Sequence, residues 1–394
     1  DRCVLCGLCS SHCPTYKLFR EEGESPRGRV MMSAALMKGE IESAGRLERH
    51  LNHCLLCRAC EKACPSEVPY GEILDLARTK LPPPNFAARL LEWASRQPLL
   101  LQLVARGAAP WGRAKLPLPA IGRAAVRPLL PGFNPTDEYY GVATEKIASE
   151  DQNRETTPVN KKRVGLFLGC VAGPFDQQTH HDAITLLTHL GYEVAVPKEQ
   201  QCCGALPQHH GNPEGAEELA QLNREAFGDK ELDAIIFTSS GCGVQLIEKG
   251  ELSVPVMEIC NFLLQSPNIG QLPIQPTNKK ISLHHPCSLT NILDGSQFVE
   301  ALLRLIPEVN LVPLGPDSSC CGAAGSHRMR EPKTADLLRQ PKIAALRADD
   351  ANILATTNYG CALHLAEGVE LDGGTIEVIH PVTLLVQQLD YTTT

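Results

Sequence analysis

The ten residues QCCGALPQHH at 201–210 hold two adjacent cysteines, a glycine and a histidine pair, and SSCCGAAGSH at 318–327 repeats the two cysteines, the glycine and one histidine. Consecutive Cα atoms lie only about 3.8 Å apart, whereas a relaxed disulfide prefers roughly 5.5 to 6 Å. A disulfide between the two neighbouring thiols is therefore disfavoured, and the pair must serve another purpose.

The repeat extends beyond the cysteine pair. His209 and His327 each lie six residues after the second thiol, and Gly241 and Gly360 each precede a further cysteine. Four cysteines recur in order, at offsets of 117, 118, 118 and 119 residues: Cys170, Cys202, Cys203 and Cys242, then Cys287, Cys320, Cys321 and Cys361. We call these the first and second CCG sets. The chain from 159 onward is thus predicted to be two homologous domains, at 159–276 and 277–394.

Apolar runs alternate with helical segments in both copies. The strand-like runs are RVGLFLG, EVAVP and AIIFTSS, then ISLHHP, NLVPLG and NILATTN, and helices are expected near 176–190, 214–227, 294–306 and 332–348. This alternation predicts α/β domains with parallel sheets. Because the cysteines follow strand ends, we expect them to converge in the crevice where such folds bind ligands.

Residues 1–81 contain two runs of the pattern C-x2-C-x2-C-x3-C-P, at 3–14 and 54–65. This spacing is typical of two-cluster bacterial ferredoxins, in which the fourth cysteine binds the other cluster. The first ferredoxin set is therefore Cys3, Cys6, Cys9 and Cys64, and the second is Cys54, Cys57, Cys60 and Cys13, each predicted to hold a 4Fe-4S cluster. The run RGRVMMSAALMKGEI at 27–41 favours a helix, so this domain is expected to be mostly helical.

Residues 82–158 contain eleven prolines, and between Pro84 and Asn134 there are seven Lys or Arg against one acid, Glu92. A basic helical linker is predicted. The stretch at 86–107 is typical of amphipathic helices, which pack on their own domain or contact a partner subunit or an anionic membrane surface.

Composition sets the broad class. A net charge of -8 over 394 residues gives no basic footprint for nucleic acid. No stretch approaches eighteen uninterrupted apolar residues, so a transmembrane helix is not expected. Seventeen patterned cysteines in a long chain indicate reduced, metal-binding thiols rather than a secreted disulfide framework. We expect a cytoplasmic protein, with a peripheral position on the inner face of the membrane as the alternative.

The metal of the CCG sets is not fixed by spacing, because four thiolates suit either zinc or an iron-sulfur centre. The neighbouring ferredoxin sets favour one or two further iron-sulfur clusters, with structural zinc as the alternative. No GxGxxG stands between a predicted strand and helix, so flavin and nicotinamide are assigned to a partner rather than to this chain.

The CCG modules resemble those of the heterodisulfide reductase catalytic subunit family. Together with CPTYKLFREEGESPRGR at 13–29 and CRACEKACPSEVPY at 57–70, the whole chain resembles the iron-sulfur subunits of glycolate oxidase. The resemblance implies a non-catalytic electron-transfer subunit. A partner flavoprotein would oxidise a 2-hydroxy acid of the glycolate or lactate type, and clusters in this chain would pass electrons to a quinone or another acceptor.

The chain departs from the reductase pattern at one position in each module. Heterodisulfide reductase modules usually end in CxxC, whereas Ser239 and Asn358 stand here in place of the first of those cysteines. This weakens the alternative in which the CCG clusters cleave a disulfide. A third hypothesis makes the CCG domains zinc-stabilised scaffolds that bring partners together.

Four further features are candidates for smaller roles. Cys260 aligns with Pro381 in the copy, which favours a buried apolar role. His209 and His327 are candidates for ligands or proton carriers. His284 and His285 precede Cys287 in LHHPC, while the first copy has LGC, so a shared ligand role is disfavoured. Arg27 and Arg29 either neutralise cluster charge or solvate a loop.

Overall fold

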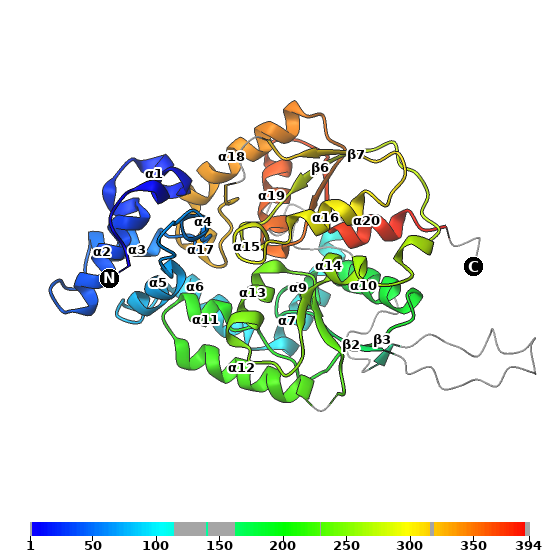
Figure 1. Ribbon diagram of the computed structural model, residues 1–394, viewed down its shortest axis with the longest axis horizontal. Helices are drawn as coiled ribbons and strands as arrows, with labels where there is room; N and C mark the ends of the chain where they lie inside the picture. The colour runs from blue at the N-terminus through cyan, green and yellow to red at the C-terminus, as the bar shows by residue number, and fades with distance from the viewer. Residues whose placement is uncertain (1, 114–138, 141–161, 229, 316–318, 391–394) are drawn as a thin grey trace, which may run out of the picture.

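The computed structural model describes residues 2–113, 139–140, 162–228, 230–315 and 319–390. A helical N-terminal region is followed by two α/β domains, each built on a parallel sheet. In Figure 1 the N-terminal region runs from blue to cyan, the first α/β domain is mainly green, and the second runs from yellow to red. The predicted fold class is confirmed.

The N-terminal region consists of short helices. The bounds are η1 Leu8–His12, α1 Pro14–Phe19, η2 Glu22–Glu24, α2 Pro26–Met37, α3 Arg46–Asn52, α4 Ala59–Lys62, α5 Tyr70–Arg78, α6 Phe86–Ser95 and α7 Pro98–Arg113. Helix α2 begins where Ser25 Oγ accepts a hydrogen bond from the Gly28 amide at 3.0 Å, with Pro26 at the first helical position. It is the helix expected at 27–41, and it ends at Met37, four residues earlier than expected.

The stretch predicted as a basic linker is helical at its start. Helix α6 packs on the rest of the chain through Ala88 and Ser95, both buried. Residues 114–138 and 141–161 of the predicted linker lie outside the described residues. No helix in the described ranges is both long and apolar enough to cross a membrane.

The first α/β domain has the strand order β1-β3-β2-β4-β5, parallel except for β1. Its elements are β1 Tyr139–Tyr140, β2 Arg163–Phe167, α9 Ala172–Phe175, α10 Gln177–His189, β3 Glu193–Ala195, α11 Ala205–His209, α12 Pro213–Gly228, β4 Ala234–Phe237, α13 Ser240–Lys249, β5 Val256–Glu258, α14 Ile259–Leu264 and η3 Ile269–Gln271. Strand β4 is buried along its whole length, as expected when helices cover both faces of a parallel sheet.

The second α/β domain repeats this order as β7-β6-β8-β9, all parallel. Its elements are β6 Lys280–His284, α15 Cys287–Asn291, α16 Ser296–Leu303, β7 Asn310–Pro313, α17 His327–Arg330, α18 Pro332–Ala348, β8 Ile353–Thr356, α19 Tyr359–Leu371, β9 Glu377–Ile379 and α20 Pro381–Gln387. Strands β2, β3, β4 and β5 thus correspond to β6, β7, β8 and β9, and the duplication extends to the sheet topology.

The two α/β domains share one hydrophobic core. Buried side chains from both sheets, among them Val164, Ile236, Ile281 and Ile353, form a single cluster. Helix α10 packs against α20, and α14 packs against α16, so helices of one domain cover the other. This junction fixes the two sheets relative to each other (Figure 1).

Candidate metal centres

The first CCG set is assembled at the carboxyl ends of the first sheet. Cys170 follows β2, Cys202 and Cys203 lie between β3 and α11, and Cys242 lies in the first turn of α13 after β4. The sulfurs of Cys170 and Cys202 are 3.5 Å apart, and Cys203 hydrogen-bonds Cys242. The structure therefore brings all four predicted thiols to one place.

The second CCG set has the same construction. Cys287 begins α15 after β6, the pair Cys320 and Cys321 lies between β7 and α17, and Cys361 lies in the first turn of α19. The sulfurs of Cys287 and Cys320 are 3.8 Å apart, and those of Cys321 and Cys361 are 3.2 Å apart. The amide of Gly322 donates to Cys320 Sγ at 3.5 Å.

The glycine after each cysteine pair is required by geometry. Gly204 and Gly322 have φ of 91° and 95°, a region that L side chains rarely adopt. A Cβ atom would stand 3.1 Å from the Ala216 carbonyl oxygen at Gly204 and 2.7 Å from that of Ala335 at Gly322. The turn that points both thiols of the pair inward therefore needs glycine.

The protonation of the thiols fits a bound cation. Hydrogen bonds from Cys170 and Cys203 lower the pKa of Cys202, and the same contacts raise the pKa of those two donors. In the second set, contacts with Cys320 and Cys361 lower the pKa of Cys321. Each site thus favours a thiolate at one cysteine of the pair, and a bound metal would supply positive charge that favours further thiolates.

Asn358 and Ser239, which stand in place of the missing cysteines, lie at the starts of helices α19 and α13. The Asn358 side chain accepts a hydrogen bond from the Cys361 amide at 3.1 Å and so caps α19. Its amide also donates to Ser240 Oγ at 3.4 Å, across the junction of the two domains. Ser239 is the N-cap residue of α13, with no side-chain capping bond. Both residues are therefore N-cap residues of helices.

The thiols of the second ferredoxin set converge. One pocket is lined by Cys13, Cys54, Cys57 and Cys60 together with Arg29 and Tyr70. Burial, followed by the neighbouring thiols of the set, raises the pKa of Cys60. Tyr70 Oη and Cys54 Sγ are 3.4 Å apart. Cys13, from the first motif, thus lies beside the three cysteines of the second motif.

The first ferredoxin set lies nearer the surface. Cys6 is exposed, while Cys3, Cys9 and Cys64 are half-buried. Burial raises the pKa of Cys9, and the neighbouring Cys3 and Cys6 add to the effect. Cys64 follows α4, which packs on the η1 turn that contains Cys9.

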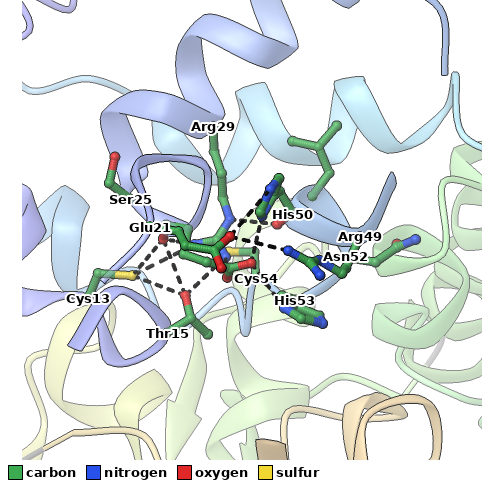
Figure 2. A network of polar contacts seen from close by, with 12 residues as sticks. Cys13, Thr15, Glu21, Ser25, Arg29, Arg49, His50, Asn52, His53 and Cys54 are labelled. Carbon is green, nitrogen blue, oxygen red and sulfur yellow. Dashed lines mark hydrogen bonds and ion pairs between the residues drawn. The ribbon is translucent and has the colours of Figure 1, made fainter. Parts of the chain in front are cut away.

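A buried charge network lies beside the second ferredoxin set (Figure 2). The Arg29 guanidinium is 2.5 Å from the Glu24 carboxylate, and both side chains are 1% exposed. Arg29 Nη1 also donates to Cys13 Sγ at 3.7 Å. His50 and His53 each place Nδ1 within 3.0 Å of Glu24 Oε1. Burial would raise the pKa of Glu24, but the hydrogen bond from His53 and the charge of Arg29 lower it to about 2.

The two arginines of the 26–29 turn have different positions. Arg29 is buried against the second ferredoxin set. Arg27 is half-exposed and donates to the Leu5 carbonyl at 3.3 Å, within the loop of the first ferredoxin set. Sequence reasoning singled out both cations but missed Glu24 and His50, because their convergence on Arg29 depends on how η2 and α3 pack.

The second ferredoxin set meets the second CCG set in a small apolar cluster. Cys57 and Cys320 are both buried in this cluster with Leu55 and Leu338, and Cys287 packs against it. The Asn291 side chain donates to the Cys57 carbonyl at 2.8 Å. The Lys62 ammonium donates to the Thr290 carbonyl at 2.7 Å, which fastens α4 to α15. No pattern along the chain indicates this contact.

The remaining candidates, Cys260, His209 and His327, differ in burial and in their neighbours. Cys260 is 0% exposed in the shared core, away from the other thiol sets. His209 is partly exposed, with Nδ1 3.4 Å from Asp75. His327 is buried, and burial followed by the charge of Arg330 lowers its pKa to about 3, so it is neutral.

Helices α6 and α7 link the first CCG set to an apolar surface. Ser95 of α6 lies beside Cys202 and is among the groups that lower the pKa of that thiol; its hydroxyl donates to the Glu92 carbonyl at 2.7 Å. On other faces these helices expose large apolar side chains: Phe86, Leu90, Trp93, Leu99, Leu103 and Val104. A groove of about 620 Å³ beside them is lined by residues that include Trp93, Arg96 and His210. The amphipathic stretch thus packs on its own chain and still presents an apolar face.

Comparisons with known proteins agree with this geometry. The family model for a 4Fe-4S dicluster domain matches residues 1–68, and that for a cysteine-rich domain matches 164–247 and 281–366. A probable glycolate oxidase iron-sulfur subunit of Bacillus subtilis (strain 168) is 30% identical, over 99% of this chain and 94% of that protein. The glycolate oxidase iron-sulfur subunit of Escherichia coli (strain K12) is also 30% identical, over 98% and 94%. One subunit of the dihydromethanophenazine:CoB--CoM heterodisulfide reductase of Methanosarcina barkeri (strain Fusaro / DSM 804) is 24% identical, over 100% and 95%.

Proposed function

The chain belongs to the family of glycolate oxidase iron-sulfur subunits, and we propose that it is the electron-transfer subunit of a flavin-dependent 2-hydroxy-acid dehydrogenase. The partner subunit would be a flavoprotein that oxidises a glycolate-type or lactate-type substrate. The electrons would leave to a quinone or another acceptor, in a complex located in the cytoplasm or on the inner face of the membrane.

One observation carries the proposal: Cys57 of the second ferredoxin set and Cys320 of the second CCG set are buried in the same apolar cluster. Iron-sulfur clusters, when bound, accept and release one electron at a time. The chain's own part is to hold two such sites against each other, with Asn291 and Lys62 fixing the contact. Leu55 and Leu338 are buried in the same cluster, so the contact between the sets is apolar and shielded from water.

The thiol sets fit four centres, two of the 4Fe-4S type and one in each CCG set. Every one of the seventeen cysteines is a free thiol, sixteen of them in these sets. Backbone amides near the sulfurs, such as those of Leu56 and Gly322, donate to Cys54 and Cys320 at 3.5 Å. Such bonds stabilise reduced clusters and tune their potentials.

Burial favours electron relay over disulfide cleavage. Catalytic cleavage requires a substrate sulfur to reach an iron atom, yet Cys202, Cys203, Cys320 and Cys321 are between 1% and 5% exposed. The adjacent pair in each set is thus buried, and only Cys170, Cys242 and Cys287 among the CCG thiols are partly exposed. The heterodisulfide reductase activity named for the M. barkeri relative is therefore the second candidate.

The apolar surface of α6 and α7 is where we place the partner subunit. It lies on the helix that also contacts Cys202, so a partner bound there is close to a predicted centre. The variants Leu99→Lys and Leu103→Lys should abolish partner binding and leave metal content unchanged. Leu371→Lys, at an equally exposed leucine of α19, is the matched control and should still bind the partner. Binding of the unaltered chain to anionic vesicles, lost in the first two variants, would instead identify a membrane contact.

The test of the proposed function is a redox titration of the anaerobically purified chain, monitored by electron paramagnetic resonance, with metal analysis of the same sample. We expect iron above eight atoms per chain, four titrating centres and no substrate oxidation without the partner. Iron near eight with stoichiometric zinc would sink the redox role of the CCG sets. Reduction of a disulfide by the isolated chain with an artificial donor would favour the second candidate.

A further inference from the structure

The second CCG set has a histidine that its sequence repeat lacks. His284 is the last residue of β6 and is 3% exposed. One of its ring nitrogens, Cys321 Sγ and Cys361 Sγ all lie within 4.8 Å of one another. Three donor atoms this close together, all from buried residues, form a potential metal site.

The two ring nitrogens of His284 have different surroundings. Nδ1 is 2.9 Å from Thr356 Oγ1, its neighbour on strand β8. Nε2 is buried and has no hydrogen-bond partner. A buried polar atom without a partner costs about 1–3 kcal/mol, so such atoms are rare unless something binds them. Metal-bound histidines commonly use one nitrogen for the metal and the other for an orienting hydrogen bond, which is the division of roles seen here.

The first CCG domain shows what the same place looks like without a nitrogen. The register of β2 with β4 pairs Phe167 with Phe237, where β6 and β8 pair His284 with Thr356. Both phenylalanines are at most 2% exposed and pack in a cluster that contains Cys202 and Cys203. An apolar pair is therefore compatible with the fold at this position. The polar pair in the second copy is not needed for packing, and a ring nitrogen of its histidine lies within 4.8 Å of the Cys321 and Cys361 sulfurs.

We propose that His284 Nε2 is a metal ligand of the second CCG set, so that this site is a mixed thiolate and imidazole centre while the first site is bound by thiolates alone. The inference rests on the proposed function, in which the CCG sets hold iron-sulfur clusters. Thr356 would be a positioning residue: in the tautomer that this role requires, its hydroxyl accepts a hydrogen bond from Nδ1–H and the Nε2 lone pair is left for the metal.

The proposed ligand makes the two CCG centres unequal. A neutral imidazole places less negative charge on iron than a thiolate does, and histidine ligation accompanies higher reduction potentials in other iron-sulfur proteins. The second centre, which lies against the second ferredoxin set, should therefore have the higher potential of the two. Duplication alone would have produced two equal centres.

The experiment uses the full chain, purified anaerobically and reduced, with natural histidine and with ¹⁵N-histidine. Pulsed electron paramagnetic resonance of the labelled chain should show one strongly coupled ¹⁵N nucleus on a centre that is not of ferredoxin type. The coupling should disappear in His284→Phe, which reproduces the residue of the first copy. It should persist in the neighbouring control His285→Phe.

A second variant tests the charge argument without removing a ligand. His284→Cys offers a thiolate in place of the imidazole, so the reduction equilibrium of one centre should shift at least tenfold toward the oxidised form, or about 59 mV. The other three potentials should stay within error.

The outcomes separate the two proposals. CCG iron without any strongly coupled histidine nitrogen overturns the role of His284 and leaves the electron-transfer function standing. A coupling that survives in His284→Phe also overturns it, because another histidine must then be the ligand. Absence of CCG iron, with only the ferredoxin signals present, overturns the proposed occupancy and this inference with it. The labelling experiment on the unaltered chain needs no variant. It can therefore refute the inference even if His284→Phe does not fold.

Discussion

The charge of Arg29 should set the reduction potential of the second ferredoxin set. The guanidinium is 3.7 Å from Cys13 Sγ and is buried, so little water screens it. At an effective dielectric constant of about 20, two unit charges at this separation interact by about 4 kcal/mol. An added electron is spread over a cluster rather than held on one sulfur, so we take about half, or ~2 kcal/mol. For a one-electron centre this equals about 90 mV.

Arg29→Gln should therefore lower the potential of one 4Fe-4S centre by about 90 mV, because the cation that favours the reduced, more negative cluster is gone. Glu24→Gln should shift the same potential upward, since it removes the counter-charge of Arg29. The double variant should fall between the two. Arg29→Lys, which keeps the charge, should stay close to the unaltered protein.

The assay is a redox titration of all four variants, followed by electron paramagnetic resonance, with iron content and circular dichroism as controls of folding. Breaking one half of a buried ion pair costs about 3–5 kcal/mol, so the single variants are expected to unfold at lower temperature. The double variant leaves no unpaired charge, so it separates the effect of charge on the potential from the effect of lost stability. Equal potentials in Arg29→Gln and Glu24→Gln would refute the reasoning, because charge would then have no part in the effect.

Three further outcomes are expected. Cys260→Ala should leave iron content unchanged and lower the free energy of unfolding by about 1–2 kcal/mol, since this thiol lies in the apolar core. Cys203→Ala should instead lower the iron content. Iron loss in both variants would contradict the assignment of Cys260 to the core. Gly322→Ala should reduce the metal content of the second CCG set, because the new Cβ would stand 2.7 Å from the Ala335 carbonyl oxygen. If metal content and the free energy of unfolding stay unchanged, the turn does not require glycine. Burial raises the pKa of Glu258 to about 7, so its proton is bound more tightly in the folded state than in the unfolded one, and stability should fall as pH rises from about 4.5 to 7, by about 3 kcal/mol in total. Glu258→Gln should flatten that dependence in denaturant titrations across this range, and an unaltered slope would argue against the raised pKa.

The cysteine sets and the duplication were open to prediction because their chemistry constrains spacing along the chain. Ligands two or three residues apart wrap one cluster, so the two ferredoxin motifs are visible in the sequence alone. The long strands of each sheet were also predictable from their apolar runs. The three-residue strands β5 and β9 were not predicted, although β3, which has the same length, was predicted from the apolar run EVAVP.

The contacts between distant segments were beyond sequence reasoning. Nothing local links Cys57 to Cys320, which meet only when α4 docks on α15. His284 was set aside because its repeat counterpart is not a histidine. That mismatch is informative only in the structure, where Phe167 and Phe237 show that the fold accepts an apolar pair and where His284 lies close to Cys321 and Cys361.

The helix contacts at the junction of the two α/β domains bear on the ancestry of the chain. Helix α10 corresponds to α16 in the repeat, and α14 corresponds to α20. The pairs observed are α10 with α20 and α14 with α16, so each copy uses one face to cover the matching face of the other. Such reciprocal contact is the mark of a two-fold axis. A founding polypeptide of a single module would have exposed this apolar face unless two molecules joined through it. The present chain thus has the construction of a symmetric homodimer whose subunits became fused, after which the two halves were free to differ, as they do at Phe167 and His284.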